Sequence, residues 1–196
     1  PGIIRVEGDW SNAAFFLAAG ALKSRVRLTG LSKLSPQGDQ SILSALTRFG
    51  AHVQQSSDVV EVSPGELHGC ELDVSETPDL LPILAVLAAN ATGETRLVNA
   101  ARLRYKESDR LTATANLVNA LGGKARELPD GLIISGGGLS GGTVDGCRDH
   151  RIVMAAAIAS IACREPVTIL GADAVNKSYP EFFEDFARLG GNWHVV

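Results

Sequence analysis

The sequence contains few of the residues that build disulfide frameworks or zinc sites. Among its 196 residues are three cysteines and four histidines, all widely spaced. An odd number of scattered cysteines favours reduced thiols in a cytoplasmic protein over a disulfide framework. The histidines form no zinc motif, so we predict that the protein binds no metal. The cysteines are Cys70, Cys147 and Cys163.

Long apolar runs and an excess of basic residues are also missing. The longest apolar stretch, 152–163, is shorter than the roughly 18 residues of a membrane span and is typical of a buried core helix. No basic region followed by an apolar segment opens the chain, so we predict no signal peptide and no membrane association. The formal net charge of −4 excludes nucleic-acid binding driven by overall basicity. Because the chain starts at Pro1 and not at Met, we expect a piece of a longer protein.

What the sequence does contain is an internal repeat. Three segments, 6–22, 74–90 and 144–160, each place a carboxylate just before an Ala- and Leu-rich stretch. The three carboxylates are evenly spaced along the chain: Asp9, Asp79 and Asp149. A short β-like piece and a second helix-like segment follow each time. Each second helix ends in a glycine, where a left-handed C-cap is expected. These glycines are Gly50, Gly122 and Gly190.

Two further short strands close the first and second repeats, so the predicted unit is β-α-β-α-β-β. The third repeat ends with one strand, 192–196, and is one strand short. The first helix of each unit is apolar nearly all round and should be buried. We therefore predict a single α/β domain over residues 1–196, a pseudo-threefold inverse α/β prism with these three helices inside. The repeats are predicted at about 3–65, 70–135 and 142–196.

Four cations stand where helix starts are predicted, although a helix N-terminus favours anions. They are Lys106, Arg110, Arg151 and Lys177, at or within the first turn of three helices. Backbone N–H groups, the helix dipole and side-chain charge then converge, which makes a strong anion site. The alternative is local pairing of these cations with Glu107, Asp109 and Asp149. Because the three turns are equivalent in the repeat and share one end of the bundle, we favour the anion site.

Two carboxylates at these turns could carry out proton chemistry. Asp79 follows a Thr-Pro pair at a helix start, and Glu107 lies between cations. Asp9 in the first repeat indicates that helix capping alone can place an aspartate at such a position. The symmetry of the repeats therefore leaves two roles open for Asp79, helix cap and catalytic group.

Five stretches of the chain are distinctive enough to compare with known families. They are "VEGDWSNAAFFLAAGAL" (6–22), "QGDQSILSALTRFGA" (37–51), "LRYKESDRL" (103–111), "DGCRDHRIVMAAAIA" (145–159) and "NKSYPEFFEDFARLGG" (176–191). In this order they resemble the 5-enolpyruvylshikimate-3-phosphate synthase family. The resemblance covers residues 5–191, and several motifs in the correct order are far more specific than one pattern match.

The resemblance implies that the chain is the C-terminal half of a two-domain enzyme. Family members join two similar domains, each of three βαβαββ units, with the active site in the cleft between them. The missing N-terminal domain would be the partner, and the first segment of the full protein would supply the strand missing from repeat three. The family reaction moves the enolpyruvyl group of phosphoenolpyruvate onto the 5-hydroxyl of shikimate 3-phosphate and releases phosphate. It uses no metal and no organic cofactor.

The resemblance also implies roles for individual residues. Phosphoenolpyruvate would be bound by Arg110, Arg151 and Lys177. Asp79 would bind the ring hydroxyls of shikimate 3-phosphate and act as base toward the 5-hydroxyl. Glu107 would transfer a proton at the methylene carbon of phosphoenolpyruvate, and Lys106 would lie against the hydroxyl and the departing phosphate.

Three more residues receive supporting roles from the resemblance. Arg102 stands where some family members carry an asparagine that contacts shikimate 3-phosphate, and it would bind that substrate. Asp149 would cap a helix and pair with Arg151, and His150 would be a packed or hydrogen-bonding neighbour.

Two competing functions stay open. One is the sister transferase that acts on UDP-N-acetylglucosamine, against which the motifs "KESDR" and "RDHR" argue. The other is a non-catalytic anion-binding module, against which the intact set of six site groups argues. Whatever the reaction, a chain without the second wall of the cleft is expected to show little or no turnover alone.

Overall fold

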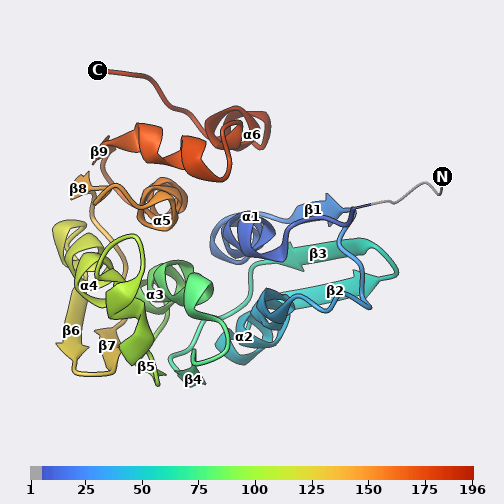
Figure 1. Cartoon of the computed structure of the whole chain (residues 1–196), viewed down its shortest axis with the longest axis horizontal. Helices are drawn as coiled ribbons and strands as arrows, with labels where there is room; N and C mark the ends of the chain where they lie inside the picture. The colour runs from blue at the N-terminus through green and yellow to red at the C-terminus, as the bar shows by residue number, and fades with distance from the viewer. Residues whose placement is uncertain (1–5) are drawn as a thin grey trace.

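The computed structural model describes residues 6–196 and has the predicted α/β fold (Figure 1). A series of helix, strand and helix recurs three times along the chain. The first strand of the predicted first repeat falls largely outside the described residues. The pseudo-threefold prism and the repeat boundaries stay predictions.

The elements follow the predicted unit closely. The first part comprises α1 (Trp10–Leu22), β1 (Val26–Thr29), η1 (Gly38–Ser41), α2 (Ile42–Phe49), β2 (His52–Ser56) and β3 (Val59–Ser63). The second comprises β4 (Glu71–Asp73), η2 (Pro78–Leu80), α3 (Leu81–Ala89), β5 (Glu94–Val98), η3 (Ala101–Tyr105), α4 (Arg110–Ala120), β6 (Lys124–Leu128) and β7 (Gly131–Ser135). The third comprises β8 (Gly142–Asp145), α5 (His150–Ser160), β9 (Val167–Leu170), η4 (Ala172–Lys177) and α6 (Phe182–Arg188).

Each part of the chain contributes its own sheet. The strand orders are β1-β3-β2, β4-β5-β7-β6 and β8-β9. The pairs β4–β5 and β8–β9 are parallel, because a helix returns the chain to the same end before the second strand. The hairpins β2–β3 and β6–β7 are antiparallel.

The first helix of each part lies in the core, as predicted. Figure 1 shows α1, α3 and α5 nearly end-on, with the sheets arranged around them. Every residue of α3 is buried, and so are His150–Ala159 of α5. A helix that is apolar on all sides has no face to present to water, so it is stable only when other elements surround it. No helix in residues 6–196 is long and apolar enough to cross a membrane.

The prediction of a strand at 192–196 is wrong. These residues have no regular secondary structure, although the Trp193 ring packs 5.2 Å from that of Phe183. In the second sheet the corresponding strand, β6, pairs with β7, and β7 lies between β6 and β5. The third part has no equivalent of β7 among the described residues. Without that neighbour, backbone groups at 192–196 have no ladder to join.

The three predicted C-cap glycines all have left-handed backbone conformations, with φ of 103° at Gly50, 80° at Gly122 and 97° at Gly190. Gly50 and Gly190 differ in their surroundings. A Cβ atom at Gly50 would lie 2.3 Å from the carbonyl oxygen of Glu66, whereas at Gly190 nothing lies within 4 Å.

This difference gives a first prediction. Alanine at Gly190 should cost only the left-handed strain, about 1–2 kcal/mol. Alanine at Gly50 should cost clearly more, because the backbone at Glu66 must also move. Urea unfolding of the two variants measures both losses in unfolding free energy. Equal losses would mean that the loop at Glu66 moves away without a cost in free energy.

Candidate active site

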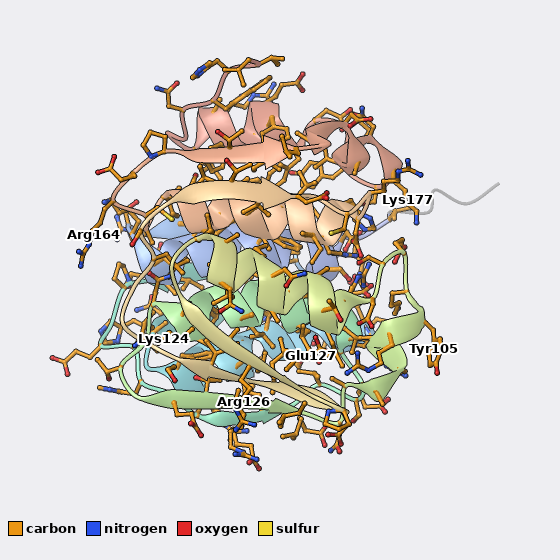
Figure 2. The ribbon with its side chains drawn as sticks, turned by 90° about the vertical axis from the view of Figure 1, so that its left-hand side faces the viewer. Tyr105, Lys124, Arg126, Glu127, Arg164 and Lys177 are labelled. Atoms are coloured by element: carbon orange, nitrogen blue, oxygen red, sulfur yellow. The ribbon has the colours of Figure 1, made fainter. Side chains whose placement is uncertain are left out.

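The candidate site lies where the three inner helices begin. Figure 2 shows Tyr105 and Lys177 at one end of the helices and Arg164, which follows α5, at the other. Contacts between side chains join six of the predicted site residues at the first of these ends: Asp79, Lys106, Glu107, Arg110, Arg151 and Lys177. They come from η2, the η3–α4 loop, α4, α5 and η4, so the fold assembles them from two of the three parts of the chain.

Helix caps fix the local backbone at this end. Asp9 accepts a hydrogen bond from the Asn12 N–H at the start of α1. Asp109 does the same for the Thr112 N–H of α4, and Asp149 for the Arg151 N–H of α5. Asp79 differs from these aspartates, because its carboxylate contacts the side chains of cations. Of the two roles left open for Asp79, the structure therefore favours a group facing the site over a helix cap.

Arg110 is the centre of the cluster. Its side chain is only 1% exposed, although it is the first residue of α4. The guanidinium donates to Asp79 at 2.6 Å and to Glu107 at 2.7 Å, and its Nε donates to Asp149 at 2.8 Å. A buried cation needs such partners, since an unpaired charge out of water is very unfavourable.

Asp79 faces three cations at once. Its Oδ1 lies 2.6 Å from Arg110 and 3.3 Å from Lys106, and its Oδ2 lies 3.5 Å from Arg151. Burial alone would raise the pKa of Asp79, but the charges of Arg151, Arg110 and Lys106 outweigh this effect and lower it. The carboxylate is therefore ionised near neutral pH, the state in which it can accept a proton.

Glu107 is held by two cations from different parts of the chain. Its Oε1 accepts from Lys177 at 2.8 Å and its Oε2 from Arg110 at 2.7 Å. Burial would raise the pKa of Glu107, yet the hydrogen bond from Lys177, a backbone hydrogen bond and the two positive charges lower it to about 2. In this state Glu107 carries no proton to give at neutral pH.

The lowered pKa of Glu107 predicts how its contribution to stability depends on pH. A carboxyl whose folded-state pKa is depressed stabilises the fold above its unfolded pKa and loses that effect as pH falls through the folded pKa. For Glu107 the loss should run from about 4.5 down to about 2. Thermal unfolding of the chain and of Glu107→Gln should differ most above pH 5, with the gap shrinking on acidification. A gap independent of pH would contradict the pairing of Glu107 in the folded state.

Two details of the predicted helix starts are wrong. Lys106 follows η3 and Lys177 ends η4, so both precede their helices instead of lying in the first turn. Asp109 caps α4 and thereby fixes its start at Arg110. Pro180 disfavours a helical conformation at the residue before it, so α6 starts only at Phe182. The two lysines therefore sit on short connecting turns.

The expected partner of Asp149 is also wrong. Its carboxylate caps α5 through the Arg151 N–H, but its side-chain partners are Arg110 and Ser108. The Arg151 guanidinium instead lies 5.8 Å from the Phe15 ring centroid and 3.5 Å from Asp79. His150 is buried, as expected of a packed neighbour.

Arg102 is not part of this contact network. It is exposed on η3, one helical turn before Lys106. The proposed contact between Arg102 and a substrate stays a prediction.

The alternative of local pairing holds only in part. Glu107 does pair with Arg110 three residues on, but Asp109 pairs with Arg104. The remaining ion pairs join different elements, so the charges form one cluster and not separate surface turns. Four cations meet three carboxylates in it, which leaves a net positive charge. The carboxylates are Asp79, Glu107 and Asp149.

Residues of the first part also reach this end, and the sequence motifs did not assign them a role. Asn12 Oδ1 lies 3.5 Å from the Arg151 guanidinium, and Ser11 donates to Asp39. Burial raises the pKa of Asp39, although the Ser11 hydrogen bond opposes this. The internal repeat could have identified these residues as neighbours of the site, because Asn12 and Asp39 occupy helix starts equivalent to those of the other repeats.

The site is an open face of the domain. A cavity of about 500 Å³ does exist, but Lys23, Asn90 and Ala162 line it, at the far ends of the same helices. Within residues 6–196 no group of three or more His, Cys, Asp or Glu side chains could hold a metal ion. Four cations at the site can bind anions, and its carboxylates can transfer protons.

Comparison with solved structures defines the class of protein. The structure of EPSP synthase from Acinetobacter baumannii matches with a TM-score of 0.89 and 30% identity, over 96% of this chain and 47% of that one. The enolpyruvyl transferase NikO from Streptomyces tendae matches with a TM-score of 0.73 and 21% identity, over 96% and 44% of the two chains. The chain therefore has the α/β fold of the enolpyruvyl transferases.

The sequence identifies the family within this class. The model of the family EPSP synthase (3-phosphoshikimate 1-carboxyvinyltransferase) matches residues 1–186. The 3-phosphoshikimate 1-carboxyvinyltransferase of Clostridium novyi is 50% identical over 188 residues, which are 95% of this chain and 43% of the relative. The chain belongs to the EPSP synthase family and spans about half the length of the relatives it matches. The matched relatives of Clostridium novyi and Clostridium acetobutylicum carry the name of this family and not that of the sister transferase that acts on UDP-N-acetylglucosamine.

Proposed function

We propose that the chain is the C-terminal domain of an EPSP synthase, which transfers the enolpyruvyl group of phosphoenolpyruvate to the 5-hydroxyl of shikimate 3-phosphate and releases phosphate. The observation that carries the proposal is the joining of Asp79 and Glu107 to four cations at one end of the helices. Both substrates carry a carboxylate and a phosphate, which four converging cations suit. A cytoplasmic location, expected from the cysteines, belongs to the same proposal.

The addition step of the reaction needs two proton transfers, one to phosphoenolpyruvate and one from shikimate 3-phosphate. The methylene carbon of phosphoenolpyruvate must gain a proton, and the 5-hydroxyl must lose one as it bonds to the adjacent carbon. Because the product still contains a carbon–carbon double bond, a proton must then leave the new methyl group as the carbon–oxygen bond to phosphate breaks, and the Glu107 carboxylate left by the first transfer is proposed to accept it. We assign the methylene proton to Glu107 and the hydroxyl proton to Asp79, whose lowered pKa makes it a carboxylate before the substrate arrives.

The cations stabilise the charge that develops on the phosphate. Arg110, Arg151 and Lys177 are proposed to bind phosphoenolpyruvate, and Lys106, 3.3 Å from Asp79, to contact both the hydroxyl and the leaving phosphate. Fixed cations need little reorganisation as charge builds, which is why they lower the barrier. Arg102 is proposed to bind shikimate 3-phosphate from its exposed position on η3.

The second wall of the site is proposed to be the N-terminal domain of the same enzyme. The candidate site faces solvent, and the chain spans only 43% of its Clostridium novyi relative. Water at an open site weakens every charge interaction, so turnover requires a cover.

The test is phosphate release from phosphoenolpyruvate plus shikimate 3-phosphate. We expect no release with the chain alone and steady release after adding the separately expressed N-terminal half. Folded halves that associate but stay silent would refute the catalytic proposal and leave a non-catalytic anion-binding module.

A further inference from the structure

Asp149 is more deeply buried than the other two carboxylates of the cluster, and its side chain accepts more hydrogen bonds. Its side chain is 0% exposed, whereas Asp79 and Glu107 are 29% and 26% exposed. Oδ1 accepts from the Arg151 N–H at 2.9 Å and from Arg110 Nη2 at 3.3 Å. Oδ2 accepts from Arg110 Nε at 2.8 Å and from Ser108 Oγ at 3.0 Å. Water has no access to replace these bonds.

The guanidinium of Arg110 has two edges, and they are used differently. A guanidinium can meet a carboxylate with two parallel hydrogen bonds along either the Nε–Nη2 edge or the Nη1–Nη2 edge. Asp149 takes the Nε–Nη2 edge with both of its oxygens. The Nη1–Nη2 edge is shared, because Nη1 donates to Asp79 and Nη2 to Glu107. One ligand carboxylate could take both positions on this outer edge.

We propose that Asp149 is a positioning residue for anion binding. It holds Arg110 by its inner edge, so that the outer edge keeps facing the site when a ligand replaces Asp79 and Glu107. The same carboxylate caps α5 and thereby sets the position of Arg151, so one side chain aligns two cations from two helices. The inference rests on the proposed function, since the intended ligand is the carboxylate of phosphoenolpyruvate.

An exchange of partners at Arg110 has a chemical consequence for Glu107. Arg110 is one of the two cations that hold the pKa of Glu107 at about 2 against the effect of burial. When a ligand carboxylate takes the outer edge, Glu107 loses this contact and gains a negative neighbour, and both changes raise its pKa. Binding of the ligand would thereby turn Glu107 into a better proton donor.

The test asks whether each of three substitutions strengthens or weakens the binding of anions. Asp149→Asn, Asp79→Asn and Glu107→Gln each remove one negative charge from the cluster, so charge alone predicts tighter anion binding for all three. We expect tighter binding of phosphoenolpyruvate and inorganic phosphate for Asp79→Asn and Glu107→Gln, because competitors for Arg110 are lost. Asp149→Asn should instead weaken binding by about tenfold or more, the effect typical of losing a group that orients a ligand-binding side chain.

Dissociation constants come from nuclear magnetic resonance titrations of the 196-residue chain. Asp58→Asn is the matched control, because it removes the same charge from an exposed turn between β2 and β3. It should leave both constants unchanged. Tighter binding by Asp149→Asn would overturn the inference, because Asp149 would then act as one more negative charge.

If the Asp149→Asn chain does not fold, a second measurement on the unmodified chain tests the inference. In the unmodified chain, the Nε–Hε signal of Arg110 should exchange slowly with water and keep its position when phosphoenolpyruvate is added. The Nη signals should shift in the same titration. An Nε–Hε signal that shifts together with them would contradict a fixed inner edge.

The same titrations separate this inference from the proposed function. If the variants follow the expected order with inorganic phosphate but phosphoenolpyruvate binds no better than phosphate, the positioning role stands and the proposed function fails. If the unmodified chain binds neither anion, both are wrong.

Discussion

Glutamine in place of Glu107 is expected to lower the rate of phosphate release by the two associated halves about 100- to 10,000-fold, the usual contribution of a positioned proton-transfer group. Glutamine keeps the shape of the side chain and an oxygen for Lys177, but it has no proton to give to a carbon atom. Binding should change far less than turnover, so the loss should appear in kcat.

The matched control for this variant is Glu94→Gln, at the start of β5 on the outside of the second sheet. Its side chain is 55% exposed, and it lies outside the cluster. The control should retain the full rate. A Glu107→Gln enzyme with more than half the original kcat would show that another group supplies the proton.

Methionine in place of Arg110 is expected to lower the unfolding free energy of the chain by about 3–5 kcal/mol, the cost of leaving one partner of a buried ion pair alone. Asp149, at 0% exposure, would lose its cationic partner and two of its four hydrogen bonds. Urea unfolding, followed by circular dichroism, measures the loss.

Two further variants test the cause of this loss. Arg96→Met removes a 46% exposed arginine that pairs with Glu71 at 3.4 Å, and it should cost at most about 1 kcal/mol. Replacing Asp149 with leucine in the Arg110→Met chain should recover part of the stability, because no unpaired charge remains buried. A double variant less stable than Arg110→Met would show that the cap at α5 matters more than the buried charge.

The framework of the fold could be predicted because its signals are local. The all-round apolar helices and the glycines that end α2, α4 and α6 follow from residue spacing and backbone conformation, and both predictions are confirmed. The prediction of a strand at 192–196 was wrong for a reason that no local sequence pattern contains. Its apolar residues suit a strand, but a strand also needs a neighbour, and β7 has no counterpart beside it.

In the candidate site, too, the sequence predicted what lies close together along the chain but not the contacts between distant residues. The motif around Lys106 and Glu107 suggested a cluster of charges, and the structure does bring these two residues into contact with Asp79, Arg110 and Lys177. The pairing of Asp149 with Arg110 spans 39 residues and depends on how α4 and α5 pack. Sequence neighbours suggested Arg151 instead, because adjacent residues are the simplest partners to assume.

The complete burial of α3 bears on how the chain folds. In stacked repeat proteins each unit touches only its neighbours, so folding can start at one unit and spread along the array. Here α3 contacts α1, α5 and α4, which belong to all three parts of the chain. No part of the chain can bury its inner helix by itself, so the three parts should fold in one cooperative step. The backbone amides of α3 should then exchange with solvent only by unfolding of the whole domain, and their exchange rates would report its global stability.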